Sequence, residues 1–420
     1  MKWNQIIAAS AVLTLLTGLT ACGEQGQTPN EPEPTPVVTE TPGPVRTDGP
    51  IWVEVTSQQG EVTSQQGEVT FQQGETVMTY DWQQPRVMGV PGAEQINAAM
   101  KQKEENFLYG AGGVEELSAE AEEFYNAYGD FGSTYALSSG VSVARADDRV
   151  ISMIFGDYTY TGGAHGYAGT SGWVYDSQTG QCLGLADLSG DETALKEFFV
   201  QYITELSKTE DYTYEGQTIF FDDYEQWIPD VVADGLWYFN NEGITFISQP
   251  YVLSSYAAGT IFFPIPYEDL EGVIDSRWLP ETAAPGGEGK LVLQQLGTQV
   301  PEGLLYNGEP LPDSGHVMFT AQGDVYDLKV SRVPYFLEEY GSQLRLYCDH
   351  LMDGEQFAMW EEFPALAMVK DLGENGADWA PPTGLITLEL EYLDGNGVAH
   401  RERVLLDEEG FLQLNAIDEK

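Results

Sequence analysis

The sequence predicts an α+β domain over residues 75–280, followed by an all-β, sandwich-like domain over residues 290–420. In the first region, segments with apolar residues at helical spacing are mixed with segments that have the two-residue period of strands. In the second region, short apolar runs are separated by turn residues, and this pattern is typical of β-sandwiches. Residues 281–289, ETAAPGGEG, form the expected linker.

The first region begins with an expected strand at 76–83, which we expect to stop at Pro85 because proline lacks the N–H of a ladder bond. Helices are expected at 93–109, 114–128, 193–206 and 221–232. Further strands are expected at 134–145, 149–160, 172–176, 236–239, 244–247 and 260–265, with a turn leading into 267–270. In the second region, strands are expected at 290–294, 316–320, 326–330, 343–347, 385–392 and 403–406.

The N-terminus has the pattern of a secretory signal. Lys2 is followed by an apolar run from Ile6 to Leu16 and then by Leu-Thr-Ala before Cys22, which is typical of a lipoprotein box. An ordinary signal peptide or a membrane helix is the alternative, but the run is too short to span a bilayer. We therefore expect a signal peptide over residues 1–21, a lipid on Cys22, and a protein anchored at the cell membrane outside the cytoplasm.

Residues 22–50 are rich in Pro, Thr, Glu and Gly and are expected to form a disordered tether. Residues 51–74 then contain EVTSQQG, EVTSQQG and EVTFQQG in tandem. The glycine of each unit weakens a helix, and an odd period would turn successive valines to opposite faces of a strand. The Val-Thr pairs favour strand, so we expect a tandem duplication in a strand-and-turn lead-in that is exposed and carries no chemistry.

The chain is strongly acidic, with 67 Asp and Glu against 18 Lys and Arg and a formal net charge of −49. Nucleic acid and anionic lipid surfaces require basic patches, so neither is expected as a partner. The charge favours a cationic partner. The alternative, that the acid serves only solubility, stays open.

The cysteines indicate little about the fold or the function. Apart from Cys22, the chain has only Cys182 and Cys348, which fall in different predicted domains. Two unpaired, buried thiols are favoured, and a disulfide between them outside the cytoplasm is the alternative. No metal site is expected from two distant cysteines.

The segment 162–166, GGAHG, contains one of the four histidines. A metal site would need more ligands, and a phosphate-binding loop would need a helix after the glycines. The favoured interpretation is structural: Gly162, Gly163 and Gly166 allow unusual backbone angles between two strands, while His165 bonds to nearby backbone or side chain. Neither a catalytic residue nor a cofactor is expected.

Tyrosines in loops bounded by prolines are the candidate ligand contacts. Tyr251, Tyr256 and Tyr267 lie near Pro250, Pro264 and Pro266, and three more tyrosines (158, 160 and 167) flank the glycine segment. Tyrosine offers a large contact area at low ordering cost, which suits a protein or glycan interface. The alternative is that these rings pack the domain's own core.

Seven short motifs occur in one order between residues 158 and 267. They are YTYTGGAHG (158–166), DSQTG (176–180), LADL (185–188), DGLW (234–237), NEGI (241–244), YAAG (256–259) and IPY (265–267). The series, within roughly residues 75–278, resembles the extracytoplasmic domain of RsiV-type anti-sigma factors and the N-terminal domain of PdaC-type peptidoglycan deacetylases. The resemblance implies a non-catalytic binding domain of α+β fold, which in the anti-sigma factors binds lysozyme.

This chain departs from both families. It has a lipoprotein box in place of a cytoplasmic segment and membrane helix, and its C-terminal region is unlike a deacetylase. Asp222-Asp223 faintly resembles the deacetylase metal motif, but two histidines four residues apart are missing. The expected function is non-catalytic binding of a lysozyme-type muramidase or of peptidoglycan at the cell envelope. The alternatives are a cell-wall-directed hydrolase and a structural or adhesive module.

Overall fold

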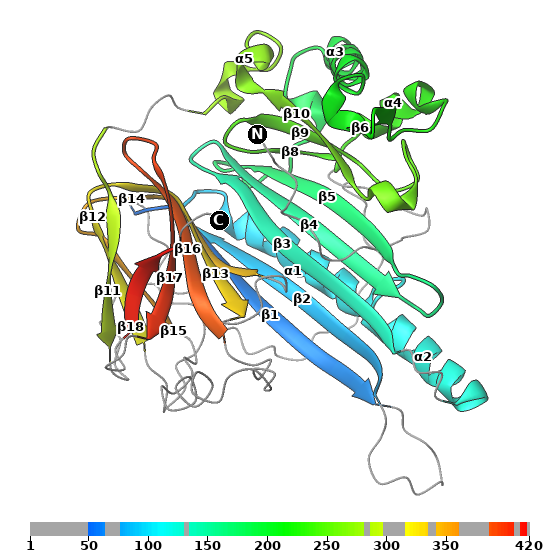
Figure 1. Ribbon diagram of the computed structural model, residues 1–420, viewed down its shortest axis with the longest axis horizontal. Helices are drawn as coiled ribbons and strands as arrows, with labels where there is room; N and C mark the ends of the chain where they lie inside the picture. Colours follow the sequence, from blue (N-terminus) through cyan, green and yellow to red (C-terminus); the bar gives the residue numbers. More distant parts are fainter. Residues whose placement is uncertain are drawn as a thin grey trace, which may run out of the picture. The chain divides into compact units, whose positions relative to one another are not determined.

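The computed structural model describes residues 49–63, 76–129, 134–280, 286–296, 316–334, 342–360, 386–406 and 412–417. The fold combines helices and strands and is mostly sheet (Figure 1). The chain divides into two compact units, of which unit 1 includes 59–82 and 88–280, and unit 2 includes 50–58, 83–87 and 281–420. The predicted signal peptide, the lipidation site Cys22 and the tether lie outside the described residues.

Unit 1 contains a long-stranded sheet in the order β2-β3-β4-β5. Its strands are β2 (Thr76–Met88), β3 (Tyr135–Ala146), β4 (Val150–Tyr160) and β5 (Tyr167–Asp176). The β2–β3 pair is parallel and the other two pairs are antiparallel.

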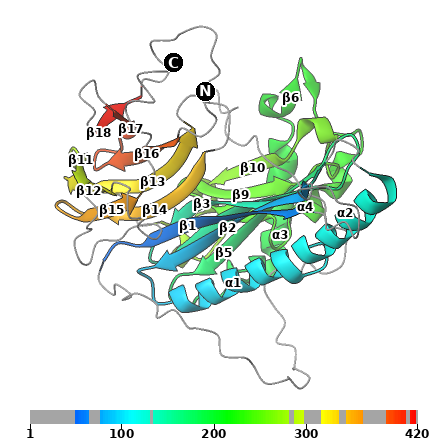
Figure 2. The same ribbon diagram turned by 90° about the horizontal axis from the view of Figure 1, so that it is seen from below.

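Helices cover one face of this sheet. They are α1 (Ala93–Tyr109) and α2 (Val114–Tyr128), which run along one side of the strands in Figure 2. Lys103 of α1 lies 4.5 Å from the ring centroid of Phe155 in β4, and Leu117 of α2 packs in one cluster with Met78 and Leu137. Both helices end as the sequence predicts, at glycine-rich turns.

The other face of the sheet carries a smaller antiparallel sheet in the order β10-β9-β8. Its strands are β8 (Trp237–Phe239), β9 (Gly243–Ser248) and β10 (Ile261–Pro266). Ser152 of β4 donates a hydrogen bond to the carbonyl of Phe239. Because Ser152 and Phe155 are three residues apart on one strand, they point to opposite faces. Unit 1 is therefore built in layers.

Gly172 of β5 allows these two sheets to approach closely. Its N–H donates to the carbonyl of Gly235 at 2.9 Å, and an added Cβ would lie 1.8 Å from the carbonyl oxygen of Trp237. A side chain here would collide with backbone rather than with a movable side chain. The close packing of β5 on β8 therefore requires glycine.

Helix α3 (Glu192–Leu206) contributes to the main core of unit 1. Asp191 caps its N-terminus by accepting a hydrogen bond from the N–H of Ala194 at 3.1 Å. Leu195, Phe199 and Ile203, each four residues apart, point into the core that β8–β10 also line.

The remaining short elements of unit 1 are η1 (Leu185–Asp187), η2 (Glu210–Tyr212), β6 (Thr213–Tyr214), β7 (Gln217–Thr218), η3 (Tyr224–Trp227), α4 (Ile228–Val231), η4 (Tyr256–Ala258), α5 (Tyr267–Leu270) and η5 (Ser276–Trp278).

The described elements of unit 2 are all strands. They are β11 (Lys290–Leu296), β12 (His316–Gln322), β13 (Val325–Pro334), β14 (Gln343–Leu351), β15 (Gln356–Trp360), β16 (Ile386–Asp394), β17 (Ala399–Leu406) and β18 (Leu412–Ala416), together with the first part of β1 (Trp52–Thr63). One group follows the order β18-β17-β16-β13-β14-β1 and the other the order β11-β12-β15. Trp52 of β1 meets Phe357 of β15 at 5.6 Å between ring centroids, so side chains from the two groups pack together.

Three expectations are corrected. The lead-in is not exposed at its start, because Trp52, Val53 and Val55 of β1 are buried where the strand pairs with β14. Strand β2 continues past Pro85, because its pairing with β3 ends at Trp82 and the missing N–H of Pro85 therefore breaks no ladder bond with β3. The helix expected at 221–232 is two short helical turns, η3 and α4, with Pro229 at the start of the second. Among the described residues, no helix has both the length and the apolarity needed to cross a membrane.

Candidate functional site

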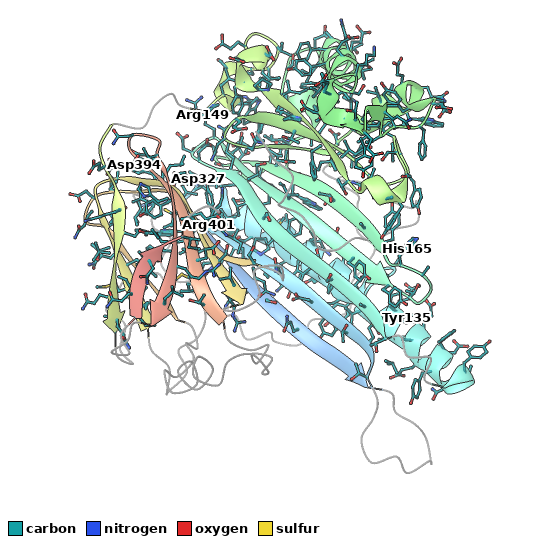
Figure 3. All side chains as sticks on the ribbon, viewed as in Figure 1. Tyr135, Arg149, His165, Asp327, Asp394 and Arg401 are labelled. Atoms are coloured by element: carbon teal, nitrogen blue, oxygen red, sulfur yellow. The ribbon has the colours of Figure 1, made fainter. Side chains whose placement is uncertain are left out.

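The glycine segment 162–166 connects β4 to β5. Gly162 and Gly163 have φ angles of 95° and 93°, a region that residues with a side chain rarely adopt. A Cβ on Gly166 would lie 2.4 Å from the ring of Tyr158. The glycines therefore shape a tight connection that leaves His165 exposed at the end of the hairpin (Figure 3).

Three rings from two loops stack at this place. The rings of His165 and Tyr256 lie 4.2 Å apart at 20°, and those of Tyr256 and Tyr251 lie 5.7 Å apart at 29°. The Tyr256 hydroxyl also donates to the carbonyl of Gly166 at 2.9 Å. We call His165, Tyr256 and Tyr251 the ring stack. The structure thus brings the glycine segment together with two of the three predicted contact tyrosines.

Hydrogen bonding in the loop fixes the tautomer of His165. Its Nδ1 lies 2.8 Å from the carbonyl oxygen of Gly166. A carbonyl oxygen can only accept, so Nδ1 is the donor. Among the described residues, the His165 side chain forms no hydrogen bond with a carboxylate, thiol or hydroxyl group. The bond to the Gly166 carbonyl fixes the orientation of the ring.

Tyr158 and Tyr167, beside the stack, have raised pKa values and stay neutral. Burial is the largest cause that raises the pKa of Tyr158, and the nearby Tyr256 and Tyr160 raise it further. The pKa of Tyr167 is raised by burial and then by Tyr251. Neutral hydroxyls both donate and accept hydrogen bonds, so Tyr158 and Tyr167 add neutral polar groups beside the stacked rings.

The backbone of Tyr251 is strained. Its φ is 69°, and its N–H donates to the carbonyl of Ser254 at 3.0 Å. For a non-glycine residue this conformation costs of order 1–3 kcal/mol and is found most often at functional sites. The side chain is 53% exposed. The turn therefore holds a large ring out at the surface.

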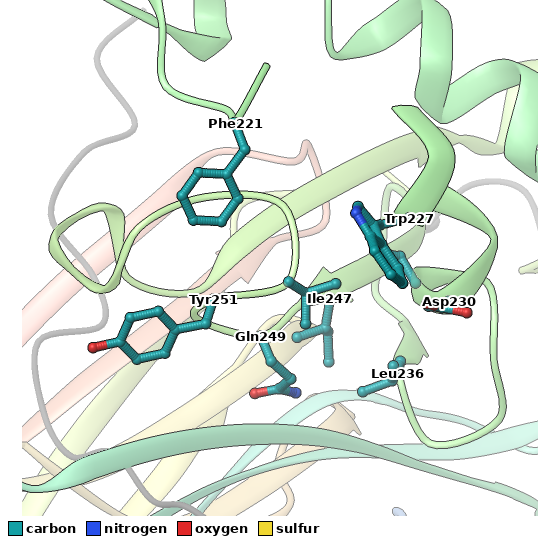
Figure 4. Close-up of a pocket in the computed structure, with 9 residues that line it drawn as sticks. Phe221, Trp227, Asp230, Leu236, Ile247, Gln249 and Tyr251 are labelled. Carbon is teal, nitrogen blue, oxygen red and sulfur yellow. The ribbon is translucent and has the colours of Figure 1, made fainter. Parts of the chain in front are cut away.

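An open pocket of about 390 Å³ adjoins Tyr251 (Figure 4). Its floor is apolar and includes Val231, Leu236, Ile247 and Val252, and its rim carries the exposed side chains of Phe221, Trp227, Asp230 and Tyr251. Gln249 also lines it. We call this the Trp227 pocket. Since Tyr251 belongs to both, the ring stack and the pocket form one continuous surface.

Backbone bonds hold the pocket walls together. The N–H of Phe221 donates to the carbonyl of Leu253 at 2.9 Å, which ties the Phe221 segment to the loop of Tyr251. The side-chain amide of Gln249 bonds both backbone groups of Thr170 in β5. The pocket is therefore formed by residues far apart in sequence and anchored to the long sheet.

Tyr267, the third predicted contact, is placed elsewhere. Its hydroxyl accepts a hydrogen bond from Arg145 at 2.7 Å and donates one to the carbonyl of Asn240 at 2.8 Å. Burial raises its pKa to about 12, although Arg145 acts in the opposite direction. Both hydroxyl bonds are made within the domain, as in the core-packing alternative.

Arg145 is a buried cation that sequence reasoning missed. Its guanidinium pairs with Asp147 at 2.6 Å, donates to the carbonyl of Trp278 at 2.7 Å, and lies 5.5 Å from the ring centroid of Phe239. The only sequence signal for this buried ion pair is the position of Arg145 at the end of an expected strand, next to the Asp147-Asp148 turn. These contacts link Arg145 of β3 to Asp147 and to η5 within unit 1.

The pocket residues Phe221 and Trp227 were also missed as contacts, because the expected continuous helix would have buried its apolar side. Asp222 and Asp223 are exposed. No group of three or more His, Cys, Asp or Glu residues suited to a metal occurs among the described residues.

The two cysteines of the described chain differ. Cys348 on β14 is buried and forms no disulfide, so the Cys182–Cys348 disulfide is not formed. Cys182 is disulfide-bonded, which corrects the expectation of two unpaired thiols. It is half-buried and forms an isolated antiparallel bridge with Tyr175, just after the turn at 177–179.

Comparison with known proteins places one family model on unit 1. Residues 186–268 match the family DUF3298, described as a protein of unknown function. This stretch includes every residue that lines the Trp227 pocket, as well as Tyr256 of the ring stack. His165 lies outside it.

Two solved structures of DUF3298 family proteins are similar to the chain. One, from Bacteroides fragilis, is 20% identical, with 54% of this chain and 94% of that chain covered and a TM-score of 0.38. The other, from Pseudomonas aeruginosa, is 16% identical, with 56% and 100% covered and a TM-score of 0.36. No curated protein matches the chain.

Proposed function

We propose that this protein is a non-catalytic binding protein of the cell envelope, whose unit 1 binds a lysozyme-type muramidase or peptidoglycan. The observation that carries the proposal is the ring stack of His165, Tyr256 and Tyr251 beside the Trp227 pocket. Exposed aromatic rings held by rigid loops are typical of the centres of protein and glycan interfaces.

The strained turn at Tyr251 supports the proposal. A ring kept at the surface in a costly backbone conformation is better explained by a ligand than by packing of the domain itself. The glycine segment supports it as well, because its backbone angles place His165 under Tyr256.

Charge favours the muramidase over the glycan. The chain carries a net charge of −49, and lysozyme-type enzymes that are basic would be attracted to it over a long range. Such attraction mainly raises the association rate, and the ring stack would then provide the short-range contacts.

The resemblance of the seven motifs to RsiV-type anti-sigma factors underlies the choice of ligand. Under this proposal, unit 1 has their α+β fold, and the two groups of strands in unit 2 form a β-sandwich of unassigned role. A lipid on Cys22 would anchor the protein to the membrane, with residues 22–50 as the tether, and would require that Cys182 is bonded to a thiol other than that of Cys22.

Calorimetry of the full chain with a basic lysozyme, at low and at raised salt, tests the proposal. Tight one-to-one binding that persists at raised salt would support it. Heat that disappears with salt would mean that only the diffuse negative charge attracts the enzyme, and would contradict lysozyme binding at the ring stack. Peptidoglycan fragments are titrated in parallel, and their release of new reducing ends would favour the hydrolase alternative.

A further inference from the structure

The Trp227 pocket combines aromatic rings with a carboxylate, that of Asp230, which has no partner among the described residues. Trp227 and Asp230 are three residues apart across η3 and α4, a spacing that places two side chains on the same side of a helical segment (Figure 4). Asp230 makes no hydrogen bond or ion pair with any described residue. None of the residues that line the pocket is a lysine or arginine.

The segment that contributes most of the pocket lining is acidic, and one of its carboxylates, Glu225, pairs with Lys208 at 3.7 Å. Residues 221–236 contain Asp222, Asp223, Glu225, Asp230 and Asp234 and no basic residue. Electrostatic complementarity therefore favours a cation as the occupant over a neutral sugar or an anion.

Unit 1 already contains a filled site of the same composition. Arg145 lies 5.5 Å from the ring centroid of Phe239 and 5.6 Å from that of Tyr267, and it pairs with Asp147. The Trp227 pocket offers the same groups, two or more rings and one aspartate, in an open form. Its volume of about 390 Å³ is at the small end of ligand sites and suits a single side chain.

We propose that the Trp227 pocket binds an arginine side chain of a basic protein ligand. The inference rests on the proposed function, because it names the chemical group that the ligand presents at this surface. A guanidinium group is flat, is weakly hydrated and stacks on aromatic faces, whereas an ammonium group does not. Its stem would cover the apolar floor, its plane would lie against Trp227 or Tyr251, and its N–H groups would donate to Asp230.

The test uses the full chain with its tryptophans replaced by 5-fluorotryptophan. N-acetyl-arginine amide is added, and the fluorine spectrum is recorded; a Trp227→Phe variant identifies the signal of Trp227. We expect a saturable shift of that signal with arginine amide and none with N-acetyl-citrulline amide, which has the same shape without the charge. A similar shift with citrulline amide, or no saturable shift with arginine amide, would overturn the inference.

Two matched acid substitutions separate the site from the general charge. Asp230→Asn should weaken arginine amide binding by about tenfold or more, because a charge-assisted hydrogen bond is lost. Asp222→Asn removes the same charge next to the pocket without lining it, and should change binding less than about twofold. Equal effects of the two variants would contradict an arginine site.

Lysozyme binding is measured on the same samples, so that the two proposals can fail separately. If lysozyme binds and arginine amide does not, the inference fails while the proposed function stands. If arginine amide binds and lysozyme does not, the pocket is an arginine site and the proposed muramidase ligand is wrong.

Discussion

Replacing Tyr251 by alanine should weaken lysozyme binding strongly. An aromatic side chain buries roughly 150–250 Å² when it is fully covered. Since Tyr251 is 53% exposed, about 100 Å² of its surface is available to a ligand. At about 25 cal/mol per Å², complete coverage is worth about 2.5 kcal/mol, which corresponds to a dissociation constant raised by roughly 70-fold.

The assay is calorimetry with a basic lysozyme at a fixed, raised salt concentration. Tyr109→Ala is the matched control, because Tyr109 is 69% exposed at the end of α1 and takes no part in the ring stack or the pocket. Denaturant unfolding checks that both variants are folded. A loss below about threefold for Tyr251→Ala, or an equal loss for Tyr109→Ala, would refute the reasoning.

Three further outcomes are expected. Arg145→Met should lower the free energy of unfolding in urea by about 3 kcal/mol, since it leaves Asp147 without its buried partner; a change under about 1 kcal/mol would count against this. Burial raises the pKa of Tyr267 to about 12, above the unfolded value of about 10, so its contribution to stability is complete below about pH 10 and is lost as the pH rises towards 12. A melting temperature that does not fall over this window would contradict it. Mass spectrometry of the mature N-terminus should find the lipid on Cys22, and Cys22→Ser should abolish it; a Cys22–Cys182 disulfide in the mature protein would argue against it, because one thiol cannot carry both.

Local patterns predicted the regular elements well. Helices α1 and α2 have the predicted bounds, and α3 begins one residue earlier than expected, because their apolar spacing and their end signals agree. Strands β4, β9 and β10 also lie within a residue of their expected positions. In these segments, local preference and tertiary packing favour the same conformation.

Strand β1 could not be predicted from its own residues. The heptapeptide period fits neither element, and what makes the segment a strand is pairing with β14, nearly three hundred residues later in the chain. The side-chain environment of Trp52 is likewise set by Phe357. Long-range pairing of this kind overrides a weak local pattern.

The candidate site was predicted only in part for the same reason. The sequence identified His165, Tyr251 and Tyr256 as separate features, but not that the first stacks on the third. The Trp227 pocket depends on bonds between Phe221 and Leu253 and between Gln249 and Thr170, none of which leaves a local signal. Tyr267 shares the proline-bounded setting of Tyr251, yet the buried Arg145 binds its hydroxyl inside the domain.

The position of Tyr251 explains why one turn can serve both surfaces. Its ring stacks on Tyr256 on one side and forms the rim of the Trp227 pocket on the other. A ligand that covers the ring stack would therefore remove water from the pocket rim as well, and the attraction between Asp230 and a cation would strengthen as the local dielectric falls. The aromatic contact and the charge contact would then reinforce each other, so that neither the acidity of the chain nor its exposed rings alone would be sufficient for tight binding.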